Sequence, residues 1–194
     1  MLEALQRLGL RIYSLSDLNL LDAQSGPLAL PILLGSLPRL QHANHRAAVV
    51  QAITEPWARP EAAKTLIDEF ISVRSEGNLV RWTIGNALSE VADDSVIDPL
   101  ETIILDQSYG RDREMVALAF ARMRDKAHAV SVLIRAASDE AILGHVLWAL
   151  RLIADQRARD VFARHVDHPI PWIRKEARRG LEKLGKQGDP REGS

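Results

Sequence analysis

A short motif recurs at near-constant spacing along the 194-residue chain. Each copy begins with a small residue and a large apolar residue, and a second apolar residue follows three positions later. The small anchor residues are Ala52, in a weak copy, then Ala87, Ala119, Ala149 and Gly180, so the steps are 35, 32, 30 and 31 residues. This period is typical of helical hairpins, none of which can bury its apolar face alone. The chain is therefore predicted to be an all-α solenoid of stacked hairpins.

Each predicted hairpin consists of an A-helix followed by a B-helix that carries the motif. The expected A-helices are approximately 29–40, 61–73, 96–106, 127–137 and 158–166. The expected B-helices are approximately 44–53, 78–92, 111–124, 140–154 and 171–184. The short loops between them favour antiparallel neighbours.

The five predicted repeats occupy residues 27–57, 58–94, 95–125, 126–156 and 157–185. Residues 1–26 lack the motif and are predicted to form an N-terminal helical cap on the first repeat. Within this cap Gly9 is expected to end the first helix, and Ser14 with Asp17 to start the second as a capping box. Residues 186–194 are predicted to be a disordered tail.

The last repeat, from Asp167 to Gly185, resembles a HEAT repeat of the short type found in phycobilin lyase subunits. An Asp and a Pro precede an Ile-Arg pair and the Ala/Leu stretch, and the resemblance extends over about 27–185. It implies a right-handed α-solenoid of about five HEAT-like hairpins. It implies no single function, because HEAT arrays serve as adaptors, transport receptors, lyase subunits and, in one branch, DNA glycosylases.

Four arginines stand six residues before their anchors, namely Arg46, Arg81, Arg113 and Arg174. The resemblance implies that each bridges to a carboxylate of a neighbouring turn or repeat, with Asp106 the partner of Arg113 and Asp167 the partner of Arg174. The alternative is that the arginines line a groove for an anionic ligand. At the other end of the motif, Asp93, Asp125 and Asp155 are expected to cap the first turn of the next A-helix.

Nothing in the sequence forms a recognisable catalytic or cofactor-binding pattern. There is no cysteine, no Ser-His-Asp order, no phosphate-binding glycine loop and no zincin motif. The pairs His42/His45 and His165/His168 lack a third ligand at metal-binding spacing. We therefore expect no catalytic residues, metal or cofactor.

The sequence also lacks a segment that would place the chain in a membrane or secrete it. The longest apolar stretch, Leu28 to Leu34, is interrupted by Pro31 and is too short to span a bilayer. The first residues include Glu3 and do not form a secretory signal. A cytoplasmic protein is expected.

The helical phase of the motif predicts a binding surface. The buried sector of each B-helix contains the anchor, and the opposite sector contains positions five before, one or two before and two after it. That sector holds Ser89, Glu114 and Leu147 together with the predicted partner-binding residues: Trp82, Asn86, Leu118, Trp148, Arg151, Lys175, Arg178 and Arg179. Tryptophan on a wet surface is typical of a binding hot spot, although Trp82 has the alternative of packing over a neighbouring helix. Trp57 and Trp172 are interpreted as core plugs between repeats.

Two further features point to a partner. The fourth B-helix is apolar nearly all round, so curvature, a second protomer or a partner is expected to cover it. The chain has a net charge of −1, but residues 157–186 hold nine Lys and Arg against four Asp and Glu. This basic end is explained either as a soluble terminal repeat or as a contact for an acidic partner.

The leading hypothesis is a non-enzymatic interaction scaffold or adaptor that binds a protein partner, or a second copy of itself, on its B-helix surface. Nucleic-acid binding, up to a HEAT-like DNA glycosylase, is the first alternative, and it is disfavoured because the positive excess is confined to one end of the chain. A bilin-lyase-like, chromophore-handling subunit is the second alternative, implied only by the resemblance.

Overall fold

The helices of the chain pair into antiparallel hairpins, as the motif predicts. A computed structural model describes residues 1–73 and 79–187, and no strand occurs among them. The chain divides into two compact units, Met1–Val96 and Ile97–Ser194, and each is described by itself. Apart from Lys186 and Gln187, which belong to the last helix, the predicted tail lies outside the described residues.

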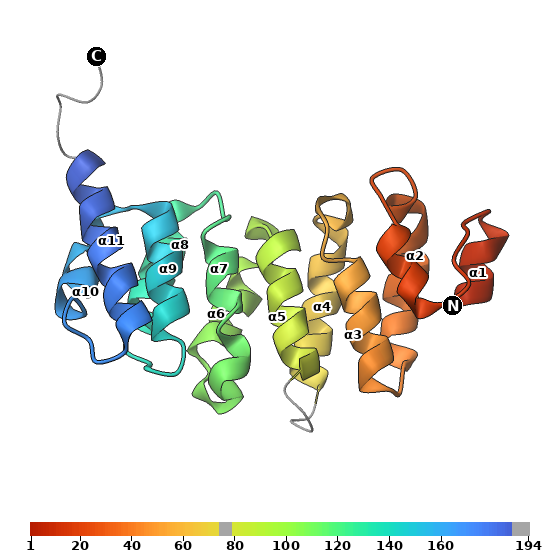
Figure 1. Cartoon of the computed structure of the whole chain (residues 1–194), viewed down its shortest axis with the longest axis horizontal. Coiled ribbons are helices and arrows are strands. Elements are labelled where there is room, and N and C mark those ends of the chain that lie inside the picture. Colours follow the sequence, from red (N-terminus) through yellow and green to blue (C-terminus); the bar gives the residue numbers. More distant parts are fainter. Residues whose placement is uncertain (74–78, 188–194) are drawn as a thin grey trace, which may run out of the picture. The chain divides into compact units, whose positions relative to one another are not determined.

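The first unit contains four longer helices preceded by shorter elements (Figure 1). Helix α2 (Gly26–Ser36) is followed along the chain by α3 (Ala43–Ala52), and α4 (Glu61–Ser72) and α5 (Leu79–Val91) form a packed hairpin. The B-helices α3 and α5 pack against each other. Ahead of them, α1 (Leu2–Arg7) contacts α2, and a 3₁₀ helix at Leu15–Leu20 contacts α3. Both predicted elements before the first repeat therefore exist, although the second is 3₁₀ rather than α; their capping role stays a prediction.

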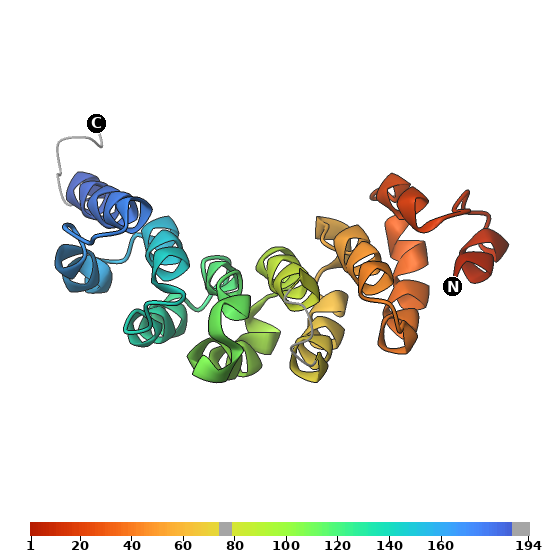
Figure 2. The same cartoon turned by 60° about the horizontal axis from the view of Figure 1, so that its bottom comes forward.

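The second unit contains three hairpins in two layers. The hairpins are α6 (Ile97–Leu105) with α7 (Val116–Phe120), α8 (Lys126–Ala136) with α9 (Leu143–Ile153), and α10 (Arg159–Arg164) with α11 (Pro171–Gln187). Figure 2 shows α7, α9 and α11 in one row and α6, α8 and α10 in the other. Helix α9 contacts α7, α8 and α11. These three neighbours bury most of the apolar fourth B-helix within the chain itself.

The third B-helix is much shorter than the predicted 111–124. Residues Gln107–Arg113 form a 3₁₀ segment interrupted at Gly110, whose φ of 53° lies in the left-handed region. After α7 the chain forms tight turns, in which the amides of Ala121 and Arg122 donate to the carbonyls of Leu118 and Ala119. The apolar spacing continues through these turns, so it did not reveal the loss of regular helix.

The repeating small residues lie where helices approach most closely. Ala87, Ala119 and Ala149 are fully buried. A Cβ atom added to Gly180 of α11 would lie 2.4 Å from the ring of Phe162 on α10. The motif therefore begins with a small residue because the partner helix occupies the space of a larger one.

The three predicted aspartates each accept from a backbone amide, Asp125 in the first turn of its A-helix and Asp93 and Asp155 in the short 3₁₀ turn that precedes theirs. The carboxylate of Asp93 accepts from the amide of Ser95 at 3.0 Å, and Asp155 accepts from the amide of Arg157 at 2.9 Å. Asp125 accepts from the amide of His128 in the first turn of α8 at 2.9 Å. Each carboxylate thus satisfies an amide that has no partner within the helix.

The repeating arginines hold neighbouring elements together, but not through the predicted partners. Arg113 is 1% exposed, donates to the carbonyl of Ile104 at 2.6 Å, and forms its ion pair with Asp139. The predicted partner Asp106 interacts with Arg113 only through charge: hydrogen bonds from Ser108 and, less strongly, the Arg113 charge lower the pKa of Asp106. Arg174 donates to the carbonyls of His168 and Pro169 instead of to Asp167.

The arginines of the first unit act in the same way. Arg46 pairs with Glu69 of α4, and Arg81 donates to the carbonyls of Phe70 and Val73 where α4 ends. Arg81 thereby supplies donors to carbonyls at the end of α4 that the helix leaves without partners.

The close contact at Gly180 predicts opposite effects for the same substitution at two places in α11. We expect Gly180→Ala to lower the free energy of unfolding by about 1–3 kcal/mol, because the added methyl overlaps Phe162. Gly185→Ala should raise it by up to about 1 kcal/mol, because nothing lies within 4 Å of its Cβ position and alanine favours the helix. Urea unfolding of both variants measures the difference; stabilisation by Gly180→Ala would contradict the packing.

Candidate functional site

The predicted partner-binding residues of the second unit come from three neighbouring B-helices. Leu118 is half-buried on α7, and Trp148 and Arg151 lie one turn apart on α9. Lys175, Arg178 and Arg179 are exposed on α11, which packs against α9. Residues from separate repeats therefore meet on one layer of helices.

An aromatic cluster occupies the part of this layer between α9 and α11. The ring centroid of His145 lies 6.1 Å from that of Trp148 and 5.4 Å from that of Trp172. Trp172 crosses from α11 onto Gly144, where a Cβ atom would lie 1.9 Å from the indole. Trp148 is 37% exposed and Trp172 is 42% exposed. Two indoles held by packing thus present apolar surface to solvent.

Beside this cluster lies a charged group centred on a buried carboxylate. Glu176 of α11 accepts from Nε of Arg151 at 2.6 Å, and its other oxygen lies 3.6 Å from Nη1 of Arg179. The Glu176 side chain is only 11% exposed. Next to it, Arg151, Arg179, Glu182, Lys183 and Lys186 line an open pocket of about 250 Å³. We call the aromatic cluster and this charged group together the α9–α11 surface, defined by His145, Trp148, Arg151, Trp172, Glu176, Arg179 and Lys183.

His145 is the titratable group under the aromatic cluster. Burial lowers the pKa of His145 below its ordinary value of 6.5, Glu114 opposes this shift, and Arg111 adds to it. Its Nδ1 lies 3.7 Å from a carboxylate oxygen of Glu114, which also pairs with Arg111 at 3.2 Å. The imidazole is therefore neutral at pH 7.

Lys175 and Arg178 lie on α11 outside the α9–α11 surface. They line a second open pocket of about 300 Å³ with Pro171, Arg174, Arg179 and Glu182. Arg178 is already engaged, since it donates to the carbonyl of Val166 at 3.0 Å and pairs with Asp167 at 3.2 Å.

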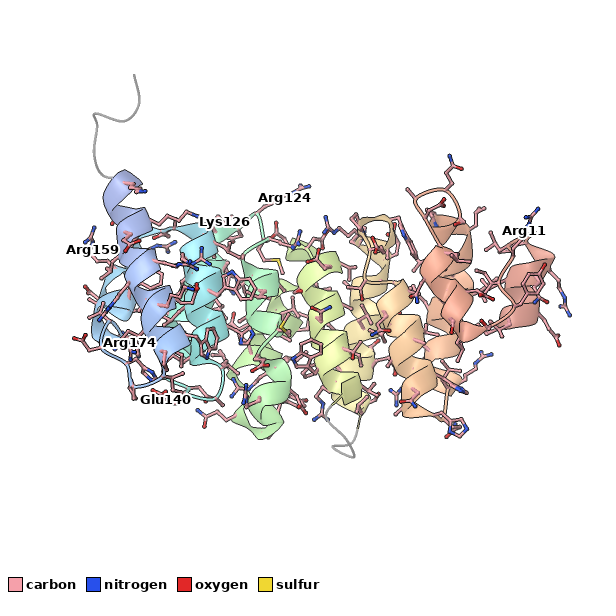
Figure 3. All side chains as sticks on the ribbon, viewed as in Figure 1. Arg11, Arg124, Lys126, Glu140, Arg159 and Arg174 are labelled. Carbon is pink, nitrogen blue, oxygen red and sulfur yellow. The ribbon has the colours of Figure 1, made fainter. Side chains whose placement is uncertain are left out.

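The loop before α11 contacts the turn between α8 and α9. Figure 3 labels Glu140 of this turn and Arg174 of α11. His168 contacts Glu140 at 3.0 Å, and Arg174 donates to the carbonyl of His168. These contacts fix the start of α11 and hence the position of Trp172.

Trp82 and Asn86 belong to α5 in the first unit. They lie one turn apart, with Trp82 39% exposed and Asn86 half-buried. Ser89, which was expected in the same sector, is buried and donates to the carbonyl of Asn86 at 2.7 Å. In the second unit Leu147 is likewise fully buried. The predicted sector was therefore wrong at Ser89 and Leu147, because the exposed side is turned by about one residue from the predicted one.

The same rotation explains which residues the sequence analysis missed. His145 stands four before its anchor and Lys183 three after, each next to a predicted position, whereas Trp172 stands eight before its anchor and precedes all of them. Trp172 does plug the space over Gly144, as predicted, but its outer part remains exposed. Glu176 was not predicted because, in the sequence of a helix rich in cations, nothing distinguishes a buried carboxylate from an exposed one.

No family model matches the chain, and no curated protein matches it. A solved structure does: a designed armadillo repeat protein in complex with the peptide (KR)4. The TM-score is 0.58 at 15% sequence identity, over 94% of this chain and 92% of that one. The chain is an all-α helical-repeat solenoid. Within the described part of this solenoid, no helix has the length and apolar character that crossing a membrane requires.

The lowered pKa of His145 predicts a specific dependence of stability on pH. Between the folded pKa and 6.5 the unfolded chain binds more protons than the folded one, so the free energy of unfolding falls as pH drops below 6.5. We expect His145→Gln to reduce the loss of stability between pH 7.5 and pH 5, as measured by urea unfolding. The control His42→Gln removes an exposed histidine of the first unit. Equal pH curves for the two variants would contradict this assignment.

Proposed function

We propose that this solenoid is an interaction module that binds an extended peptide segment of a partner protein on its B-helices. The observation that carries the proposal is the α9–α11 surface, where Trp148 and Trp172 expose apolar area beside guanidinium groups held by Glu176. Tryptophan and arginine are the residues that most often dominate protein interfaces. Rigid side chains also lose little conformational entropy on binding.

The fold supports the same proposal. The designed armadillo repeat protein is in complex with a peptide, and it shares with this chain its fold alone. Adjacent B-helices repeat their exposed positions at each repeat, which suits a segment whose residues also repeat along an extended backbone. In this proposal Leu118 on α7 and Lys175 and Arg178 on α11 provide further contacts within the second unit. Trp82 and Asn86 on α5 remain predicted partner-binding residues of the first unit.

The alternatives have less support. Residues 97–194 hold 17 Lys and Arg against 15 Asp and Glu, an excess of two, which is small for a protein that neutralises several phosphates. The finer resemblance to short HEAT repeats of phycobilin lyase subunits stays a prediction, and so does the chromophore-handling role that it implies. Self-association through the same surface is a further prediction.

The proposal is tested by selecting binders from a random peptide display library against the full chain. We expect selected peptides to lose at least about 2 kcal/mol of binding free energy with Trp148→Ala, which is the scale of a hot spot. The single variant is preferable to one that also removes Arg151, because losing Arg151 would leave buried Glu176 without its closest cation.

Two controls separate binding from folding. Tyr13→Ala removes an aromatic side chain that is 71% exposed and lies outside the B-helices, so it should leave binding unchanged. Thermal melts should show Trp148→Ala close to wild type, since truncation of a core tryptophan would cost about 3–5 kcal/mol. Failure to enrich any peptide, or equal binding to Trp148→Ala, would refute the proposal.

A further inference from the structure

The charges on the α9–α11 surface point to the kind of peptide that it binds. We infer that the segment is acidic, with apolar side chains against Trp148 and Trp172 and carboxylates in the pocket beside Arg151 and Arg179. This inference rests on the proposed function and specifies its partner. The pocket is lined by four cations, Arg151, Arg179, Lys183 and Lys186, and one carboxylate, Glu182.

Glu176 positions the arginines without exhausting them. A guanidinium has five N–H donors, and Glu176 takes Nε of Arg151 and faces Nη1 of Arg179. Lys183 donates to the carbonyl of Leu152 at 3.2 Å and retains two further donors. Counting Glu176 and Glu182 against the four cations leaves two positive charges at the pocket. Donors therefore remain for the carboxylates of a ligand, already oriented by a buried anion.

The helix dipole does not account for this distribution of charge. Cations near the C-terminus of a helix are stabilised by its dipole, which would explain Lys183 and Lys186. Lys175, however, is exposed and directly follows the first turn of α11, where the dipole disfavours cations and no acidic residue is present. The basic character thus extends along the whole helix, as a contact for an acidic partner requires.

An acidic peptide fits this surface better than a nucleic acid does. Because Glu176 and Glu182 offset two of the four cations, the pocket has an excess of two positive charges, which suits one or two carboxylates better than a continuous phosphate backbone. The neighbouring indoles are suited to apolar side chains of a peptide. The cation nearest to Trp148 is Arg151, which lies one helical turn away. A peptide residue that binds Arg151 would therefore lie within a few residues of the apolar peptide residue that binds Trp148.

The test uses the full chain and the fluorescently labelled nonapeptide (EEL)3, with (QQL)3, (KKL)3 and (KR)4 for comparison. Nine extended residues span up to about 30 Å, enough to cross neighbouring helices whose axes lie about 8–10 Å apart. Fluorescence anisotropy should show (EEL)3 binding roughly tenfold more tightly than (QQL)3 and the basic peptides, with an affinity that falls as salt rises.

A pair of charge-matched variants locates the binding. We expect Arg179→Gln with Lys183→Gln to weaken (EEL)3 binding roughly tenfold while leaving (QQL)3 unchanged. The control Arg159→Gln with Arg164→Gln removes two exposed cations of α10 in the same unit and should leave binding unchanged. Both double variants keep the Arg151–Glu176 pair, and thermal melts check that both remain folded.

The outcomes separate the inference from the proposed function. Tighter binding of (KKL)3 or (KR)4 than of (EEL)3 overturns the acidic partner and leaves peptide binding intact. An equal loss with the α10 control also overturns it, because the effect would then be one of overall charge. If none of these peptides binds, the acidic partner is overturned, and the display selection decides the proposed function independently. Salt-dependent binding of duplex DNA without peptide binding overturns both.

Discussion

The close approach of helices at small residues is the contact on which the rest of the structure depends. Gly180 lies against Phe162 within the last hairpin, and Gly144 lies under Trp172 between the last two. In each case an aromatic ring fills the space where a side chain would otherwise stand. The first contact joins an A-helix to its own B-helix, and the second sets one B-helix against the next. The same few positions thus determine the hairpin and the layer.

Once the layers are close, the ends of the helices need hydrogen-bond partners that water no longer supplies. Asp93, Asp125 and Asp155 provide acceptors for the turn that follows each of them. Arg81 and Arg113 provide donors for carbonyls at the end of the preceding helix. Arg113 is almost fully buried and reaches both a carbonyl and Asp139. An uncompensated charge at that depth would be costly, so the regular arginine column is a structural device. That leaves the exposed cations of α11 as the ones available for a ligand.

The sequence predicted the hairpins well because a period and a buried sector are properties that each repeat expresses on its own. Side-chain partners were predicted poorly, because Asp139 and Glu69 come from different elements than the arginines they bind. The spacing of residues along the sequence does not show which side chains of neighbouring helices meet. The short α7 was not predicted because the apolar spacing continues through the 3₁₀ segment before α7 and the turns after it. Of the candidate site, Trp148 and Arg151 were found from the motif, whereas His145 and Glu176 became visible only when neighbouring B-helices were placed side by side.

Glu176 connects this architecture to function. A buried carboxylate is expensive unless it is paired, and here the pairing groups come from α9 as well as from α11 itself. The carboxylate therefore stabilises the arrangement of the two helices and at the same time restricts the guanidinium group of Arg151, while Arg179 stays half exposed beside it. A solvated arginine would lose rotamer freedom on binding an anion, whereas an arginine already fixed by a buried partner has lost most of it during folding. Glu176 cancels one positive charge, which weakens the attraction of the surface for an anion. The preorganisation of the guanidinium group offsets this loss, so a carboxylate within a basic surface is consistent with anion binding.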